Sequence, residues 1–183
     1  MRDPAPPYRG EGPHALWHAS EDAGIRAFAP HRARTATEDE PLVWAIDTRH
    51  LPLYWFPRDC PRGTFWAGPN TTEEDVARFL GARACRVHAV EPPWDERMRT
   101  ATLYAYRLPE ETFEPYEPAG GYWISRATIE PLEAVELRAL DRLHEEAAIE
   151  LLVVPRLLDL WDDVVASTLE FSGIRLKNAR TRR

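Results

Sequence analysis

The chain has 183 residues, of which 44% are hydrophobic and 29% are charged, and its formal net charge is −7. This length suits one domain that buries a core of its own, and the ordinary composition excludes a wholly disordered or membrane-embedded chain. Because non-specific nucleic-acid affinity comes from Lys and Arg that neutralise phosphates, the negative charge argues against general nucleic-acid binding.

The sequence carries no sign of export or membrane insertion. No apolar run approaches the roughly 20 residues that span a bilayer, and the first residues, M-R-D-P-A-P-P-Y-R-G, lack the apolar core of a signal peptide. The two cysteines, Cys60 and Cys85, indicate neither a secreted disulfide framework nor a zinc ribbon. We therefore expect a cytoplasmic protein of bacterial type with no membrane partner.

The chain begins with a segment rich in Pro and Gly, which predicts a flexible arm over residues 1–13. Residues 15–20 have the character of a short strand, and the Ser-Glu-Asp cluster that follows can cap a turn or helix running to residue 28. A polar loop over residues 30–41 comes next. Ordered structure is therefore expected from about residue 15.

The middle of the chain is predicted to be rich in strands. Residues 42–47 are continuously apolar, which is typical of a central strand covered on both faces. Three prolines within 48–66 favour a short helix followed by an ordered loop, and the Thr and Glu spacing near residue 71 predicts a helix to residue 80. Residues 86–91 and 100–108 alternate as strands, joined through a turn-prone segment and expected to pair as neighbours.

The last third of the chain is predicted to contain both strands and helices. Residues 121–125 and 132–137 are predicted to be extended, with the intervening Pro indicating an edge or a bend. A helical period begins at residue 137, and residues 149–154 form a compact β-branched strand. An apolar stripe over 157–169 predicts a final amphipathic helix, with Glu170 included in it.

These elements predict the α+β class, with a mixed, mainly antiparallel sheet and flanking helices, because helices interrupt the strands without strict alternation. We expect one domain over residues 14–177 and a solvated basic tail over 178–183. Neither G-x-G-x-x-G nor G-K-[ST] occurs, so the Rossmann and P-loop mechanisms lose their phosphate-binding backbone.

Two polar groups amid dense aromatic residues are candidates for a site. His18 and Ser20 lie two residues apart on a strand, so their side chains share a face and can hydrogen-bond one ligand; the alternative is a core histidine bonded to a backbone carbonyl. Arg58 and Asp59 lie between two prolines, where Arg58 can clamp a phosphate or carboxylate, with Arg62 joining it. The alternative is an Arg–Asp pair that fixes the loop.

The cysteines and histidines are candidates for catalysis and metal binding. A thiolate at Cys60, near Arg58 and Arg62, would be a nucleophile if its pKa were lowered, whereas a buried small apolar thiol is the commoner case. A metal site would draw on His14, His18, His31 and His50, but no H-E-x-x-H or C-x-x-C spacing is present, so no metal is expected. His88 and His144 are interpreted as structural or solvated.

Five motifs carry a resemblance: L-W-H-A-S-E, V-W-A-I-D, F-P-R-D-C-P-R, G-Y-W-I-S-R and A-S-T-L-E-F-S-G-I-R-L-K-N-A. Over nearly the whole chain they resemble an uncharacterised family of bacterial single-domain proteins. More remotely, a strand with His, a second strand and a helix carrying Tyr resemble the ADP-ribosyltransferase-like fold, with its RNA 2′-phosphotransferase and DNA-modifying branches. In that superfamily the His holds the ribose of NAD and the Tyr stacks on nicotinamide.

The resemblance implies site residues in this chain. His18 and Tyr54 match the first two positions as catalytic residues, and Ser20 would lie close to His18. Trp44 or Trp55 could replace Tyr54 as the stacking ring, because an electron-rich ring attracts a cationic nicotinamide. The rings of His18 and Tyr54 would then line one solvent-accessible cleft.

The resemblance also implies an acidic residue on a later strand that directs the transfer. Glu170 is assigned to this third position, and Glu130 and Glu136 lie near suitable strands. Arg58 would hold phosphate. NAD is then the expected cofactor, and the partner is a small nucleotide or its macromolecular acceptor.

Two functions follow. The first is a nucleotide-binding ADP-ribosyltransferase-like domain that acts as an NAD-dependent transferase. The second is a non-catalytic binding protein whose cleft takes a nucleotide, a nucleic-acid end or a protein. A third, a Cys60-dependent enzyme, predicts selective labelling of Cys60 over Cys85.

Overall fold

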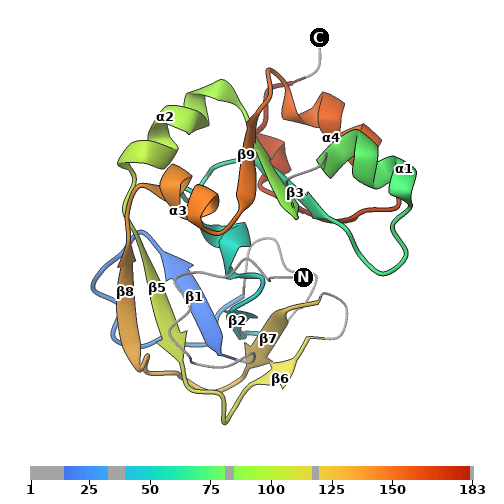
Figure 1. Ribbon diagram of the computed structural model, residues 1–183. Coiled ribbons are helices and arrows are strands. Elements are labelled where there is room, and N and C mark those ends of the chain that lie inside the picture. The colour runs from blue at the N-terminus through green and yellow to red at the C-terminus, as the bar shows by residue number, and fades with distance from the viewer. Residues whose placement is uncertain (1–14, 33–39, 81–84, 117–119, 182–183) are drawn as a thin grey trace. The chain divides into compact units, whose positions relative to one another are not determined.

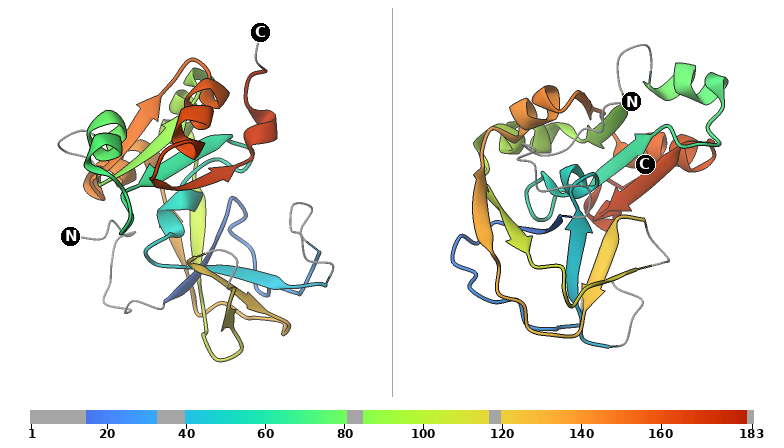
Figure 2. Two further views of the ribbon diagram at one scale, coloured as in Figure 1. Left: turned by 90° about the vertical axis from the view of Figure 1, so that its right-hand side faces the viewer. Right: turned by 60° about the horizontal axis from the view of Figure 1, so that its bottom comes forward.

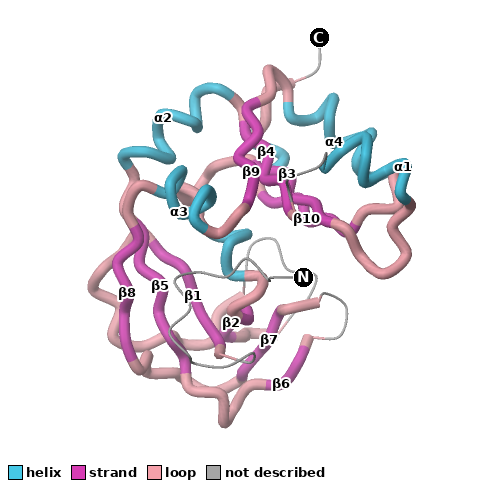
Figure 3. Tube along the Cα trace, viewed as in Figure 1, coloured by secondary structure: helices cyan, strands magenta, loops and turns pink. Residues whose placement is uncertain are grey.

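The computed structural model describes four stretches of the chain, residues 15–32, 40–80, 85–116 and 120–181 (Figure 1). The chain forms two compact units, one from Met1–Trp55 and Leu103–Leu137, the other from Phe56–Thr102 and Arg138–Arg183. Figure 3 shows strands in both parts, with the labelled helices α1 to α4 among residues of the second unit. The expected α+β class with mainly antiparallel sheets is confirmed.

The first unit contains a six-stranded sheet with the order β6-β7-β2-β1-β5-β8, in which every neighbouring pair is antiparallel. The strands are β1 (Leu16–Ser20), β2 (Val43–Asp47), β5 (Leu103–Leu108), β6 (Glu114–Pro115), β7 (Tyr122–Ser125) and β8 (Glu133–Leu137). The predicted strand over residues 42–47 is an interior one, as expected. The short 3₁₀ helix η1 (Leu51–Tyr54) follows β2 and contains a proline in its first turn, where the missing N–H costs no hydrogen bond.

One hydrophobic cluster of this unit includes residues of three strands and two connecting segments: Leu16, Phe28, Val43, Ala45, Tyr106, Leu108 and Ile129. Phe28 was expected at the end of a turn or helix, but the segment from residue 21 to 28 contains no helix. Phe28 instead pairs with Ile129 through backbone hydrogen bonds in both directions, at 2.8 and 2.9 Å. The long-range bridge therefore takes the place of local helical bonds.

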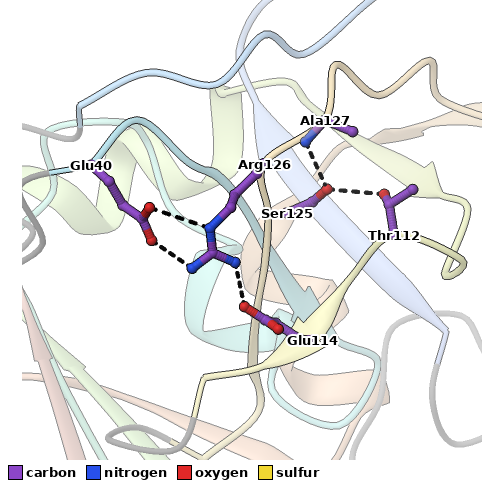
Figure 4. A network of polar contacts seen from close by, with 6 residues as sticks. All are labelled: Glu40, Thr112, Glu114, Ser125, Arg126 and Ala127. Atoms are coloured by element: carbon purple, nitrogen blue, oxygen red, sulfur yellow. Dashed lines mark hydrogen bonds and ion pairs between the residues drawn. The ribbon is translucent and has the colours of Figure 1, made fainter.

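A polar network, in which the ion pairs are exposed and Ser125 is buried, holds the end of β7 (Figure 4). The Arg126 guanidinium donates hydrogen bonds to the carboxylates of Glu40 and Glu114, and Ser125 donates to the Thr112 hydroxyl at 2.9 Å. The hydrogen bonds to Glu40, and then those to Glu114, raise the pKa of Arg126 above its ordinary value, so this side chain stays charged. Because the ion pairs are solvated, they contribute little to stability.

The second unit contains a four-stranded sheet with the order β10-β3-β4-β9, in which only the β4–β9 pair is parallel. The strands are β3 (Arg62–Trp66), β4 (Arg86–Val90), β9 (Ile149–Val153) and β10 (Glu170–Ile174). Both views of Figure 2 show the red strand β10 alongside the teal strand β3. The helical elements are α1 (Glu73–Asp75), the π-helical turn η2 (Val76–Leu80), α2 (Pro92–Thr100), α3 (Leu140–Glu146), α4 (Leu157–Val165) and η3 (Leu176–Asn178).

Four predictions that concern this unit are corrected. The turn expected between the strands at 86–91 and 100–108 is helix α2, whose first two residues are prolines placed where a helix tolerates them. Its flanking strands β4 and β5 belong to different sheets and do not pair. The loop expected up to residue 66 contains β3, and α4 ends at Val165, so Glu170 opens a strand.

A tryptophan packs over two glycines in the second sheet. Gly63 of β3 and Gly173 of β10 are direct cross-strand partners. A Cβ on Gly63 would lie 2.8 Å from Cε3 of Trp161, and a Cβ on Gly173 would lie 2.6 Å from its Cζ2. Because neither glycine has a side chain, the indole of Trp161 on α4 can lie directly against the sheet.

The predicted basic tail is anchored as far as the structure describes it. The backbone N–H of Arg180 donates to both carboxylate oxygens of buried Glu91 at 3.1 Å, and the Asn178 amide donates to the Asp59 carbonyl at 2.9 Å. Glu91 also accepts from the N–H of Leu157, at 3.0 Å, where α4 begins. Residues 178–180 are therefore held to the second unit by hydrogen bonds, while Asn178 and Arg180 stay exposed to solvent.

None of the described helices has the length and apolar character needed to cross a bilayer.

Candidate functional site

His18 lies where two strands of the first sheet stop pairing. The registered β1–β2 pairs are Leu16 with Asp47 and Trp17 with Ile46, whereas β1 stays paired with β5 as far as Ser20. The His18 Nδ1 atom lies 3.0 Å from the Trp44 carbonyl oxygen, across this opening. The ring is half-buried, and it packs at 4.7 Å from the ring centroid of Phe28. A hydrogen bond to a backbone carbonyl is what the alternative interpretation, a structural histidine, predicts for His18.

Four half-buried rings form what we call the aromatic group: Trp44, Tyr54, Tyr116 and Tyr122. The Tyr54 and Tyr122 hydroxyl oxygens are 3.0 Å apart, and their ring centroids are 6.3 Å apart. The Trp44 ring meets those of Tyr116 and Tyr122 edge to face, with centroids 4.9 and 6.4 Å away. Four separate segments of the first unit therefore bring these rings together.

Strand register decides which sheet face each residue occupies, because cross-strand partners project to the same side. Trp17 pairs with Ile46, which pairs with Tyr122, so these residues share a face with Trp44. His18 follows Trp17 and projects from the opposite face. The structure thus connects His18 to the aromatic group through the Trp44 backbone, and it does not place the His18 and Tyr54 rings on one face.

The face of His18 carries its own polar residues. Ser20 is paired with Tyr104 of β5, and Tyr104 is paired with Glu136 of β8, so the three side chains form one row. His18 begins the adjacent row, opposite Tyr106. Glu136, considered from the sequence as an acid, therefore lies on the same face as His18 and Ser20.

Trp55, considered as a stacking ring, is buried in the first unit, where Glu130 also lies; Arg58, Arg62 and Glu170 lie in the second unit. Arg58 is exposed in the loop before β3, whereas Arg62 is buried, donates to the Cys60 carbonyl at 3.1 Å and lies 5.0 Å from the Phe56 ring centroid. Glu170 accepts a hydrogen bond from the indole of Trp66 at 2.6 Å. Glu170 thus has a structural partner on the neighbouring strand.

Cys60 does not have the properties of a nucleophile. It is fully buried, and burial, opposed by Arg62 and Arg97, raises the pKa of the thiol to about 12. The lowered pKa considered from the sequence is therefore contradicted. Arg58 and Arg62 were expected to lower the pKa of Cys60, and of these two only Arg62 acts on it.

We expect iodoacetamide at pH 8 to modify Cys85 and leave Cys60 unmodified in the folded protein, because Cys85 is partly exposed and the Cys60 thiolate is disfavoured. Peptide mapping by mass spectrometry measures the two rates. Both thiols should react in urea, and faster modification of Cys60 in the native protein would restore the nucleophile hypothesis.

Sequence reasoning missed a buried pair of imidazoles in the second unit. His88 Nδ1 and His144 Nε2 are 2.9 Å apart, and both residues are fully buried. A signal was available, because His144 falls four residues after Leu140 on the apolar side of α3. In the part of the chain that the structure describes, no three His, Cys, Asp or Glu side chains are grouped to hold a metal ion, and His14 lies outside it.

These observations define an α+β protein with two sheets, the first of which carries partly exposed aromatic and polar groups. The chain belongs to a family of unknown function, DUF6886, whose model matches residues 17–179. The expected membership of an uncharacterised family is confirmed, whereas the ADP-ribosyltransferase-like fold is not. No curated protein and no solved structure matches the chain.

Proposed function

We propose that this chain is a nucleotide-binding protein that uses the aromatic group to stack a base or nicotinamide ring. The observation that carries the proposal is the gathering of four partly exposed rings, Trp44, Tyr54, Tyr116 and Tyr122, from four segments. Partly exposed aromatic faces stack bases with little dependence on base identity, and each stacked base contributes about 1–3 kcal/mol. This is the non-catalytic binding function considered from the sequence.

Polar atoms at the same place support a nucleotide over a purely apolar ligand. The paired hydroxyls of Tyr54 and Tyr122 belong to the aromatic group, and such hydroxyls can donate to or accept from a base edge or a ribose. His18 holds the backbone of Trp44 through its carbonyl and so positions the ring that would stack. The ligand would then be held by rings and hydroxyls together.

Titration with NAD, ADP-ribose and GTP, followed by tryptophan fluorescence, tests this function. Binding should quench the wild-type signal, and Trp44→Leu should remove most of the response and weaken affinity by about tenfold or more. Trp94→Leu, on α2 of the second unit, is the matched control and should leave affinity unchanged. Silence with all three ligands, or equal loss in both variants, would contradict the proposal.

His18→Ala separates a binding role from a structural one. We expect weaker nucleotide binding with a nearly unchanged melting temperature, since the ring is half-buried and its hydrogen bond contributes about 1 kcal/mol. Thermal unfolding and the same titration provide the two readouts. A large loss of stability with unchanged binding would assign His18 to the fold alone.

One observation favours a second function, NAD-dependent ADP-ribosyl transfer. His18, Ser20 and Glu136 share a sheet face, which offers a hydrogen-bonding imidazole, a hydroxyl and a carboxylate toward one ligand. Release of nicotinamide from NAD would report this activity. Glu136→Gln should abolish it, while Glu133→Gln, on the opposite face of the same strand, should not; no release by the wild type leaves binding as the function.

A further inference from the structure

The buried imidazoles of the second unit form a relay between a strand and a helix. His88 lies at the centre of β4, which is an interior strand between β3 and β9. His144 lies in the last turn of α3 and places its Nδ1 atom 2.6 Å from the carbonyl oxygen of Leu140. The 2.9 Å contact between the two rings then joins α3 to β4.

The chemistry of these contacts fixes where the protons are. A carbonyl oxygen only accepts, so His144 Nδ1 carries a hydrogen and donates it to Leu140. In the neutral ring, His144 Nε2 is then an acceptor, and His88 Nδ1 must donate to it. His88 Nε2 is left as a buried acceptor without a hydrogen-bond partner among the described residues. The hydrogen bond between the rings therefore requires that His144 Nε2 carries no proton.

The surroundings oppose a positive charge on either ring. The Phe56 ring packs 5.5 Å from His88 and 5.1 Å from His144, and it offers no hydrogen bond to a new N–H. Arg62 of β3 and Arg86 of β4, both buried, add positive charge near His88, whereas Asp141 of α3 favours protonation of His144.

The pKa values agree with this geometry. Burial first, and then the charges of His144, Arg86 and Arg62, hold the pKa of His88 well below its usual value of 6.5. Burial also lowers the pKa of His144 to about 4, although the Leu140 hydrogen bond and Asp141 act in the opposite direction.

We propose that the His88–His144 pair is an acid-sensitive latch that holds α3 against β4 at neutral pH and releases it when either ring is protonated. A proton on His144 Nε2 would set two N–H groups against each other across the contact. A proton on His88 Nε2 would place a cation beside two arginines. The first change breaks the hydrogen bond itself. The second leaves the His88 Nδ1–H donor in place but puts an uncompensated charge into the buried contact, so both changes oppose the packing of α3 on β4.

The direction of the pH effect follows from linkage. Both folded-state pKa values lie below those of the unfolded chain, so the unfolded chain binds more protons between about pH 4 and pH 6.5. The stabilisation is complete above pH 6.5 and is lost as the pH falls toward 4. Each histidine then lowers the folding equilibrium constant of the second unit by about tenfold per pH unit.

Hydrogen exchange of the wild-type protein at pH 7.0 and pH 4.5, corrected for intrinsic rates, tests the latch. Amides of α3 and β9 should lose at least tenfold in protection at pH 4.5, while β1 and β5 of the first unit keep theirs. The described histidines of that unit, His18, His31 and His50, are at least partly exposed. Unchanged protection in α3, or equal losses in both sheets, would overturn the proposal.

A double variant gives the second test. His88→Phe with His144→Leu replaces both partners by apolar groups, a change that can be nearly neutral in a core. This variant should keep the protection of α3 at pH 4.5, whereas the control His31→Gln should remain as acid-sensitive as the wild type. Acid sensitivity that survives the double substitution would overturn the proposal, and if this variant does not fold, the wild-type measurement decides.

Discussion

Glu91→Ala is expected to lower the free energy of unfolding by about 3 kcal/mol. The Glu91 carboxylate is buried, and it accepts hydrogen bonds from the backbone N–H groups of Leu157 and Arg180. Removing the acceptor leaves both donors unsatisfied, and each hydrogen bond to a charged group contributes about 1.5–3 kcal/mol. Urea unfolding followed by circular dichroism measures the change.

The position of Glu91 explains why one side chain has this effect. It follows the last residue of β4, and its two partners are the start of α4 and the C-terminal segment. Glu96→Ala, an exposed substitution on α2, is the control and should change stability by less than about 0.5 kcal/mol. An equally small change for Glu91→Ala would show that water replaces the carboxylate at both donors.

Gly173→Ala and Gly63→Ala are each expected to destabilise the protein by about 1–3 kcal/mol, because the new methyl group would overlap the indole of Trp161. The effect should be greater at Gly173, where the added carbon would also lie 2.7 Å from Leu176 Cδ1. Thermal unfolding of the single variants provides the measurement.

A control and a compensating change make this prediction specific. Gly120→Ala, a position with nothing within 4 Å of the added carbon, should leave the melting temperature nearly unchanged. In the background Trp161→Leu, which removes the large ring, Gly173→Ala should cost clearly less than in the wild type. The same cost in both backgrounds would exclude the Trp161 contact as the cause.

The strands that could be predicted are those with a continuous or alternating apolar pattern. The predicted strands over residues 15–20 and 42–47 are β1 and β2, and the β-branched run at 149–154 is β9. β3 and β10 were missed; each contains a glycine, Gly63 or Gly173, which weakens the local strand pattern. Their glycines are required by Trp161, a residue roughly a hundred positions from the first of them, and no local pattern contains that requirement.

The candidate site was predicted in part, for a related reason. The spacing of His18 and Ser20 correctly indicates a shared face, because alternation within a strand is a local property. The relation between His18 and Tyr54 depends on the register of β1 with β2 and of β2 with β7, which the sequence does not display. The pair of His88 and His144 likewise joins elements that are far apart in the chain.

The chain passes between its two units after Trp55, Thr102 and Leu137. During synthesis on the ribosome, β1 therefore cannot pair with β5 until β3 and β4 of the second sheet have been made. The parallel partner of β4, strand β9, emerges only after the first sheet is complete. Neither sheet can thus be finished before the other has been started, and no single cut in the chain yields either one as an uninterrupted fragment.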